Sequence, residues 1–61
     1  MDSDTKYWMI QAMQMHGGSF IKSLAMAWLR ADPFNAQKLE NTFPEYVKEY
    51  TELGQMMKNE S

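Results

Sequence analysis

Apolar residues recur along the chain at the three- and four-residue spacing of α-helices, and three short breaks divide this pattern into four segments. The breaks are the Gly-Gly-Ser run at 17–19 and the proline-containing pairs at 32–33 and 43–44. No strand-like alternation and no internal repeat is visible. We therefore expect an all-α fold, a compact bundle that forms a single domain over 1–61, with frayed ends at 1–3 and 59–61. The predicted helices cover about 4–15, 19–31, 33–42 and 44–57.

The residues at the breaks are of the types that begin and end helices. Gly17 is expected to end the first helix, and Ser19 to cap the second. Asp32 followed by Pro33 is a cap with proline at the first helical position, which predicts the start of the third helix. Gly54 is either the C-cap of the fourth helix or a glycine tolerated in its interior.

The four predicted helices differ in the width of their apolar faces. The third has a narrow stripe and the fourth a clean face, whereas the first two have apolar arcs near ~200°, twice the ~100° that a surface helix needs. One explanation is that the helix at 19–31 lies centrally and is covered by the other three. The alternative is that part of the helix at 4–15 forms a homodimer seam or a partner-binding patch, and from it we expect a homodimer.

Composition narrows the function classes. The chain has 61 residues and no cysteine, so disulfides are excluded and a reducing cytoplasm fits. Its net charge of −2 argues against a generic nucleic-acid binder. No signal peptide is visible, and no apolar run approaches the ~18 residues that span a bilayer. We expect a cytoplasmic protein that does not act on a membrane.

Catalytic and metal-binding patterns are missing from the sequence. His16 is the only histidine, and no second histidine or cysteine could complete a metal site or a nucleophilic triad with it. The run at 17–19 could offer backbone N–H groups to an anion, but it follows a helix and lacks the phosphate-loop pattern. It is better interpreted as a turn, in which Gly18 could let the first two helices approach closely. We expect no enzyme activity, no cofactor and no metal.

Several methionines, one phenylalanine and a row of glutamates are candidate contacts for a protein partner. Methionine adapts to irregular surfaces, and an acidic ridge along the outer side of the fourth helix could dock on a basic surface. A solvated face is the default explanation of the glutamates, and Phe34 could instead fold back onto the end of the second helix. The candidates are Met9, Met13, Met26, Phe34, Glu45, Glu49, Glu52 and Met56.

Two functions of different classes follow. The first is a module that binds another protein. The second is a helix-turn-helix regulator, in which the helix at 33–42 would place Gln37, Lys38 and Asn41 in the major groove, beside Phe34. The third helix has one lysine and one glutamate, which makes it a weak phosphate binder. We therefore expect a protein partner and not a nucleic acid.

The sequence also resembles a family of small helical proteins encoded by bacteriophages and prophages. The resemblance covers residues 7–50 and rests on the segments HGGSF, LAMA, ADPFN and FPEY, most of whose positions are turns, caps and core. It implies a short phage product acting inside a bacterial cell, where such proteins often bind and inhibit or redirect a host factor or a defence system. It brings no particular activity to this chain.

Overall fold

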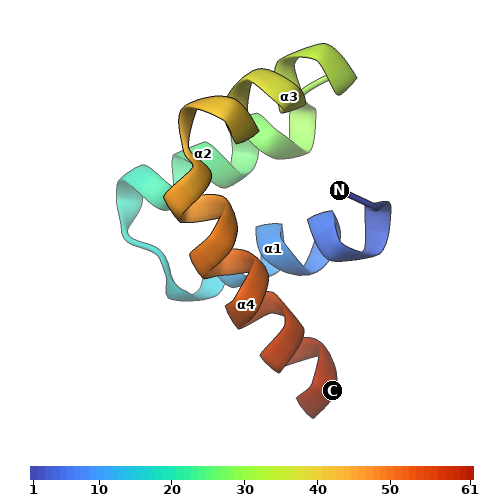
Figure 1. The fold of residues 1–61 in the computed structure, drawn as a ribbon. Helices are drawn as coiled ribbons and strands as arrows, with labels where there is room; N and C mark the ends of the chain where they lie inside the picture. Colours follow the sequence, from blue (N-terminus) through green and yellow to red (C-terminus); the bar gives the residue numbers. More distant parts are fainter.

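The computed structural model describes all 61 residues and contains four helices and no strand. They are α1 (Ser3–His16), α2 (Ser19–Arg30), α3 (Pro33–Thr42) and α4 (Pro44–Glu60), shown in Figure 1. The predicted all-α bundle is confirmed, and the predicted bounds of the first three helices hold to within one residue. None of the four helices has the length and apolar character needed to cross a membrane.

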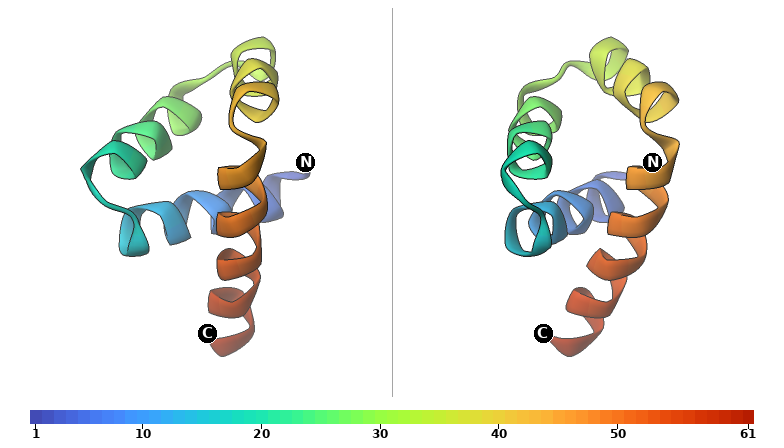
Figure 2. Two further views of the ribbon diagram at one scale, coloured as in Figure 1. Left: turned by 60° about the vertical axis from the view of Figure 1, so that its left-hand side comes forward. Right: turned by 90° about the vertical axis from the view of Figure 1, so that its left-hand side faces the viewer.

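The chain folds around α1. Helix α2 turns back over one side of α1, α4 crosses α1 on another side, and α3 bridges the far ends of α2 and α4 (Figure 2). The end of α4 extends past α1, away from α2 and α3 (Figures 1 and 2). The expectation that the second helix is central is therefore wrong, because α1 is the helix that packs against two others along its length.

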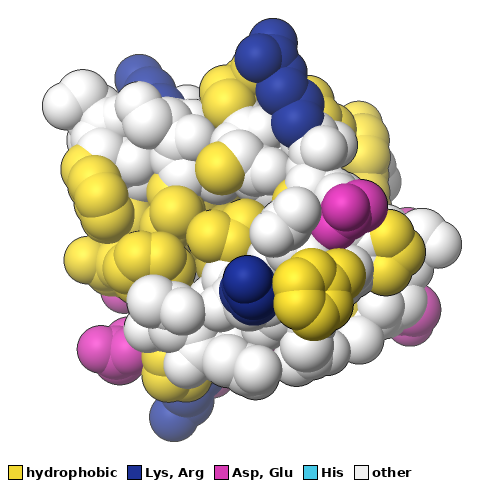
Figure 3. Space-filling view, turned by 90° about the horizontal axis from the view of Figure 1, so that it is seen from above, with side chains coloured by type: hydrophobic (Ala, Val, Ile, Leu, Met, Phe, Trp, Pro, Cys, Tyr) yellow, Lys and Arg dark blue, Asp and Glu magenta, His cyan; other side chains and the backbone are white.

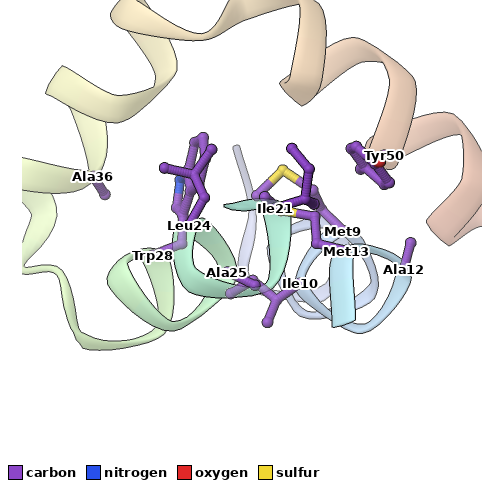
Figure 4. Packing of buried hydrophobic residues seen from close by; sticks show 10 residues of the cluster. All are labelled: Met9, Ile10, Ala12, Met13, Ile21, Leu24, Ala25, Trp28, Ala36 and Tyr50. Atoms are coloured by element: carbon purple, nitrogen blue, oxygen red, sulfur yellow. The ribbon is translucent and has the colours of Figure 1, made fainter. Parts of the chain in front are cut away.

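The hydrophobic core explains the wide apolar arc of α1. Figure 4 shows Met9 and Met13 beside Ile21, with Trp28 on one side of them and Tyr50 on the other. A helix covered by two neighbours at once needs a wider apolar arc than a helix covered by one. The arc is thus accounted for within one molecule. The ten buried hydrophobic residues are Met9, Ile10, Ala12, Met13, Ile21, Leu24, Ala25, Trp28, Ala36 and Tyr50.

Aspartates cap the starts of two helices, and the cap at Asp32 is the one predicted above. A carboxylate oxygen of Asp2 accepts a hydrogen bond from the backbone N–H of Thr5 at 2.8 Å. An oxygen of Asp32 accepts from the N–H of Asn35 at the same distance. Each bond satisfies one of the four N–H groups that lack a partner inside the helix at its start.

The turn between α1 and α2 differs from the prediction. Ser19 lies inside α2, and Gly18 is the N-cap, so this helix start has no side-chain hydrogen bond. Gly17 has φ −84° and ψ 157°, an extended conformation and not the left-handed one of a typical glycine C-cap. Its glycine identity has a steric reason, because a Cβ there would lie 2.3 Å from Cγ2 of Ile21. Gly18 faces open space and brings no helices together.

Helix α4 continues through Glu60, three residues beyond its predicted end at about 57. Gly54 is an interior residue of α4 and is buried where this helix meets α1. Lys58 forms an ion pair with Asp4 of α1, which ties the end of α4 to the start of the chain. The Asp4 carboxylate raises the pKa of Lys58 through a hydrogen bond and its charge.

Candidate functional site

The two methionines predicted on α1 are not available to a partner. Met9 and Met13 have no exposed surface and lie in the centre of the core (Figure 4). Their prediction as partner-binding residues is wrong, because α2 and α4 both cover the face of α1 that carries them. The homodimer seam inferred from that face loses its surface for the same reason.

Met26 and Phe34 lie at the surface, on different helices. The sulfur of Met26 accepts a hydrogen bond from the side-chain amide of Gln14 at 3.6 Å, which joins α2 to α1. Phe34 is 69% exposed, and the ammonium nitrogen of Lys38 lies 4.7 Å from the centre of its ring. The expected fold-back of Phe34 onto α2 is therefore wrong, because its ring packs against the next turn of its own helix.

The acidic ridge, defined as Glu45, Glu49 and Glu52 with Met56 beyond them, is exposed along α4. None of the three glutamates takes part in an ion pair, since the only one in the molecule joins Lys58 and Asp4. The geometry of the ridge fits a solvated face and a docking face equally well, and its role stays a prediction.

A groove between α2 and α3 is the largest hollow of the surface, with a volume of about 470 Å³. A volume of this order accommodates a small ligand or several side chains of a partner. We call it the α2–α3 groove. Its lining residues are Ala27, Arg30, Ala31, Asn35, Lys38, Leu39, Thr42 and Phe43.

The sequence builds this groove from small residues on one helix and large ones on the other. Ala27 and Ala31 have short side chains that leave space on the α2 side. Leu39 and Phe43 form an apolar wall on the α3 side. The Asp32-Pro33 start of α3 turns the chain so that the two helices face each other across this space. Leu39 and Phe43 also pack against the core, so the wall is held in place from behind.

Aromatic residues extend the apolar wall beyond the groove. Phe43 stacks on Tyr46 with ring centres 5.7 Å apart, and Phe20 of α2 meets Phe43 edge-on at 6.2 Å. Phe20 is 56% exposed although it belongs to this cluster. Figure 3 shows hydrophobic side chains gathered on the face formed by α2 and α3, with Lys and Arg side chains beside them.

The charged residues of the groove are all basic. Arg30 and Lys38 line it, no acidic residue does, and neither cation takes part in an ion pair. No cluster of His, Cys, Asp or Glu is arranged to hold a metal ion, and His16 lies exposed at the end of α1. The groove is therefore suited to binding by apolar contact and positive charge.

Sequence reasoning missed the groove although it left a signal. The apolar arc predicted for 19–31 was wider than one neighbour could cover, and in the structure Phe20, Ala27 and Leu29 of that arc remain exposed. No sequence pattern pointed to Arg30 and Lys38, because whether they line one groove depends on the angle between α2 and α3. None of the eight predicted contact residues lines the groove.

Comparisons with protein-family models, with curated proteins and with solved structures found no match to this chain. The resemblance to bacteriophage proteins accordingly stays a prediction.

Proposed function

We propose that the protein acts by binding another protein, and that the α2–α3 groove with the adjoining ring of Phe20 is its contact surface. The observation that carries the proposal is an apolar hollow with exposed aromatic and basic residues at its edge. Partner-binding sites combine such apolar anchors with polar rims, and aromatic and arginine side chains dominate their energetics.

The cellular context follows from the resemblance to phage-encoded proteins. We propose a partner in the bacterial cytoplasm, a host factor or a defence protein, whose action is inhibited or redirected when the groove is occupied. A homodimer stays a separate prediction, for which the buried face of α1 no longer supplies the seam.

Capture from bacterial lysate with matched variants tests this function. Ala27→Glu places a charge on the groove floor at an exposed helical position, and Met15→Glu makes a similar apolar-to-acidic change at the exposed end of α1. We expect wild type and Met15→Glu to retain one protein in stoichiometric amount and Ala27→Glu to lose it. Equal capture by all three, or no stoichiometric capture, contradicts the proposal.

DNA binding by α3 is the second candidate, supported by the exposed polar face of this helix. Against it, the amides of Gln37 and Asn41 are hydrogen-bonded to each other at 3.1 Å, and the net charge is −2. A DNA reader binds duplex DNA with an affinity that falls steeply with salt, so absence of binding at low salt excludes this function.

A further inference from the structure

The charge of the α2–α3 groove is opposite to that of the whole chain. The protein carries eight acidic and six basic residues, yet the groove contains two bases and no acid. Arg30 and Lys38 are both exposed and come from different helices, so a bound segment would meet one cation from each side. Neither is neutralised by a neighbouring carboxylate.

The floor and wall of the groove require a partner that is not purely polar. Ala27, Ala31, Leu39 and Phe43 present apolar surface that water covers in the free protein. A polar group placed against these four residues would be desolvated without a compensating hydrogen bond from them, whereas an apolar side chain gains by burial. Arg30 and Lys38 line this space and could engage groups that flank such a side chain, the Lys38 ammonium from its position over the Phe34 ring.

We infer that the groove binds an acidic protein segment in which an apolar side chain lies between carboxylates. The apolar side chain would occupy the space above Ala27 and Ala31, and the carboxylates would pair with Arg30 and Lys38. This inference rests on the proposed function and names the chemistry of its partner. Arginine adds geometric preference, because its planar guanidinium engages a carboxylate through two parallel hydrogen bonds.

Two other occupants fit less well. Nucleic acid binds through many phosphate contacts, and a site with two cations and an apolar floor offers few. A second copy of the chain would present its acidic ridge. The large residues between those glutamates, Tyr46, Val47 and Tyr50, are half-buried or buried against the core, so the exposed ridge offers no large apolar side chain between its carboxylates. Both occupants become outcomes of the test.

The test titrates isotope-labelled protein with short synthetic peptides and follows backbone amide shifts by NMR. The first probe carries a leucine flanked by glutamates, and matched probes replace the glutamates with glutamine or lysine, or the leucine with serine. We expect the glutamate probe to shift the amides of Asn35, Leu39 and Thr42, with saturation in the ~1 mM range or tighter. The glutamine probe should bind about five- to tenfold more weakly, as the loss of two exposed ion pairs implies. The serine probe should bind at least about tenfold more weakly, as the loss of one buried side chain implies.

A charge exchange separates recognition from general stability. The variant Arg30→Glu/Lys38→Glu should bind the glutamate probe at least about tenfold more weakly than wild type does, and should bind the lysine probe more tightly. Lys22→Glu/Lys48→Glu changes the net charge equally at exposed positions outside the groove and should bind the glutamate probe as wild type does. Dispersed amide spectra confirm that each variant is folded.

Three results overturn the inference. They are equal binding of the glutamate and glutamine probes, groove shifts caused by duplex DNA at lower concentration than by the peptide, and concentration-dependent self-association that the glutamate probe reverses. The last result assigns the groove to a second copy. Failure of the peptides while Ala27→Glu still abolishes capture from lysate rejects only the acidic chemistry, whereas unimpaired capture by Ala27→Glu rejects the proposed function itself.

Discussion

Gly54 of α4 lies directly on the backbone of Trp8 in α1. A Cβ atom at position 54 would stand 2.6 Å from both the carbonyl carbon and the carbonyl oxygen of Trp8, and 2.9 Å from the nitrogen of Met9. These atoms belong to the backbone of a buried helix turn, so they cannot move aside as a flexible side chain could. Gly54 therefore sets the distance at which α4 crosses the central helix.

We predict that enlarging residue 54 destabilises the protein in proportion to size. In a helix interior, alanine is favoured over glycine by about 1 kcal/mol. Overpacking costs about 1–3 kcal/mol, and contact with rigid backbone places Gly54→Ala toward the upper end, so the net sign is destabilising. Gly54→Val should cost more still. Urea unfolding followed by circular dichroism measures the series, and an alanine variant more stable than wild type contradicts the close contact.

The role of Gly54 shows where sequence reasoning ends. Composition and spacing predicted four helices and all their bounds but the end of α4, because proline, aspartate and glycine act within a few residues of themselves. Whether Gly54 ends a helix or marks a crossing depends on a contact with Trp8, 46 positions earlier in the chain. The same limit made α2 appear central. The α2–α3 groove likewise depends on the angle between two helices, which no local sequence pattern encodes.

The N-terminus of α2 offers a stabilising substitution. Gly18 caps this helix with no side-chain hydrogen bond, its φ of −76° suits any residue, and a Cβ there meets nothing within 4 Å. Gly18→Asp should add a hydrogen bond to a free N–H group and a negative charge at the positive end of the helix, for a gain of about 0.5 kcal/mol. The midpoint of thermal or urea unfolding measures the change.

Gly18→Ala is the control for that substitution. Alanine reduces the freedom of the unfolded chain as aspartate does, but it cannot cap the helix. If both variants stabilise equally, the gain comes from the unfolded state and the missing cap has no consequence.

Alkaline pH should destabilise the protein partly through Tyr50. Burial, and secondarily the charge of Glu49, raises the pKa of its hydroxyl above the usual 10.0. The folded state thus holds its proton more tightly than the unfolded state, so the contribution is complete below pH 10 and is lost as pH rises through the folded pKa. Lys58 has the same sign, since Asp4 raises its pKa above 10.5. The free energy of unfolding should therefore fall with pH above about 10.

Two variants separate these contributions. Tyr50→Phe should lose less stability between neutral and alkaline pH than wild type does. The loss that remains in this variant includes the contribution of Lys58. Asp4→Asn removes the partner of Lys58 and should keep the part due to Tyr50. Unfolding by urea at a series of pH values measures both, and parallel curves for wild type and Tyr50→Phe would show that Tyr50 is ionised equally in both states.

The methionines should oxidise in an order that follows their burial. Met15 and Met56 are 69% and 58% exposed, whereas Met9 and Met13 have no accessible surface. Sulfoxide formation needs access to sulfur, so limited peroxide treatment should modify the first pair and spare the second. Peptide mass spectrometry gives the order, and denaturant should abolish it. Early oxidation of Met13 in the native protein would show that the face of α1 carrying it is accessible, which contradicts its burial.

The acidic ridge gives a final prediction, in which stability and binding are measured together. Glu45 and Glu49 repel each other across one helical turn, and the sequence offers no cation between them that forms an ion pair. Glu49→Lys replaces this repulsion with an attraction in the favourable order, glutamate before lysine, so we expect a gain of about 0.4–1 kcal/mol. Chemical unfolding measures it, and Glu49→Gln, which removes the repulsion without adding the attraction, should gain about half as much.

The same variant distinguishes the two interpretations of the ridge. If the glutamates form only a solvated face, Glu49→Lys raises stability and leaves capture of a partner from lysate unchanged. If they dock on a basic surface, stability rises while capture falls, because a charge reversal at the rim slows association and weakens it at low salt. A loss of both would place Glu49 in the packing of α4, which its exposure does not predict. A misfolded variant would lose both stability and capture, so a gain in stability together with a loss of capture cannot come from misfolding.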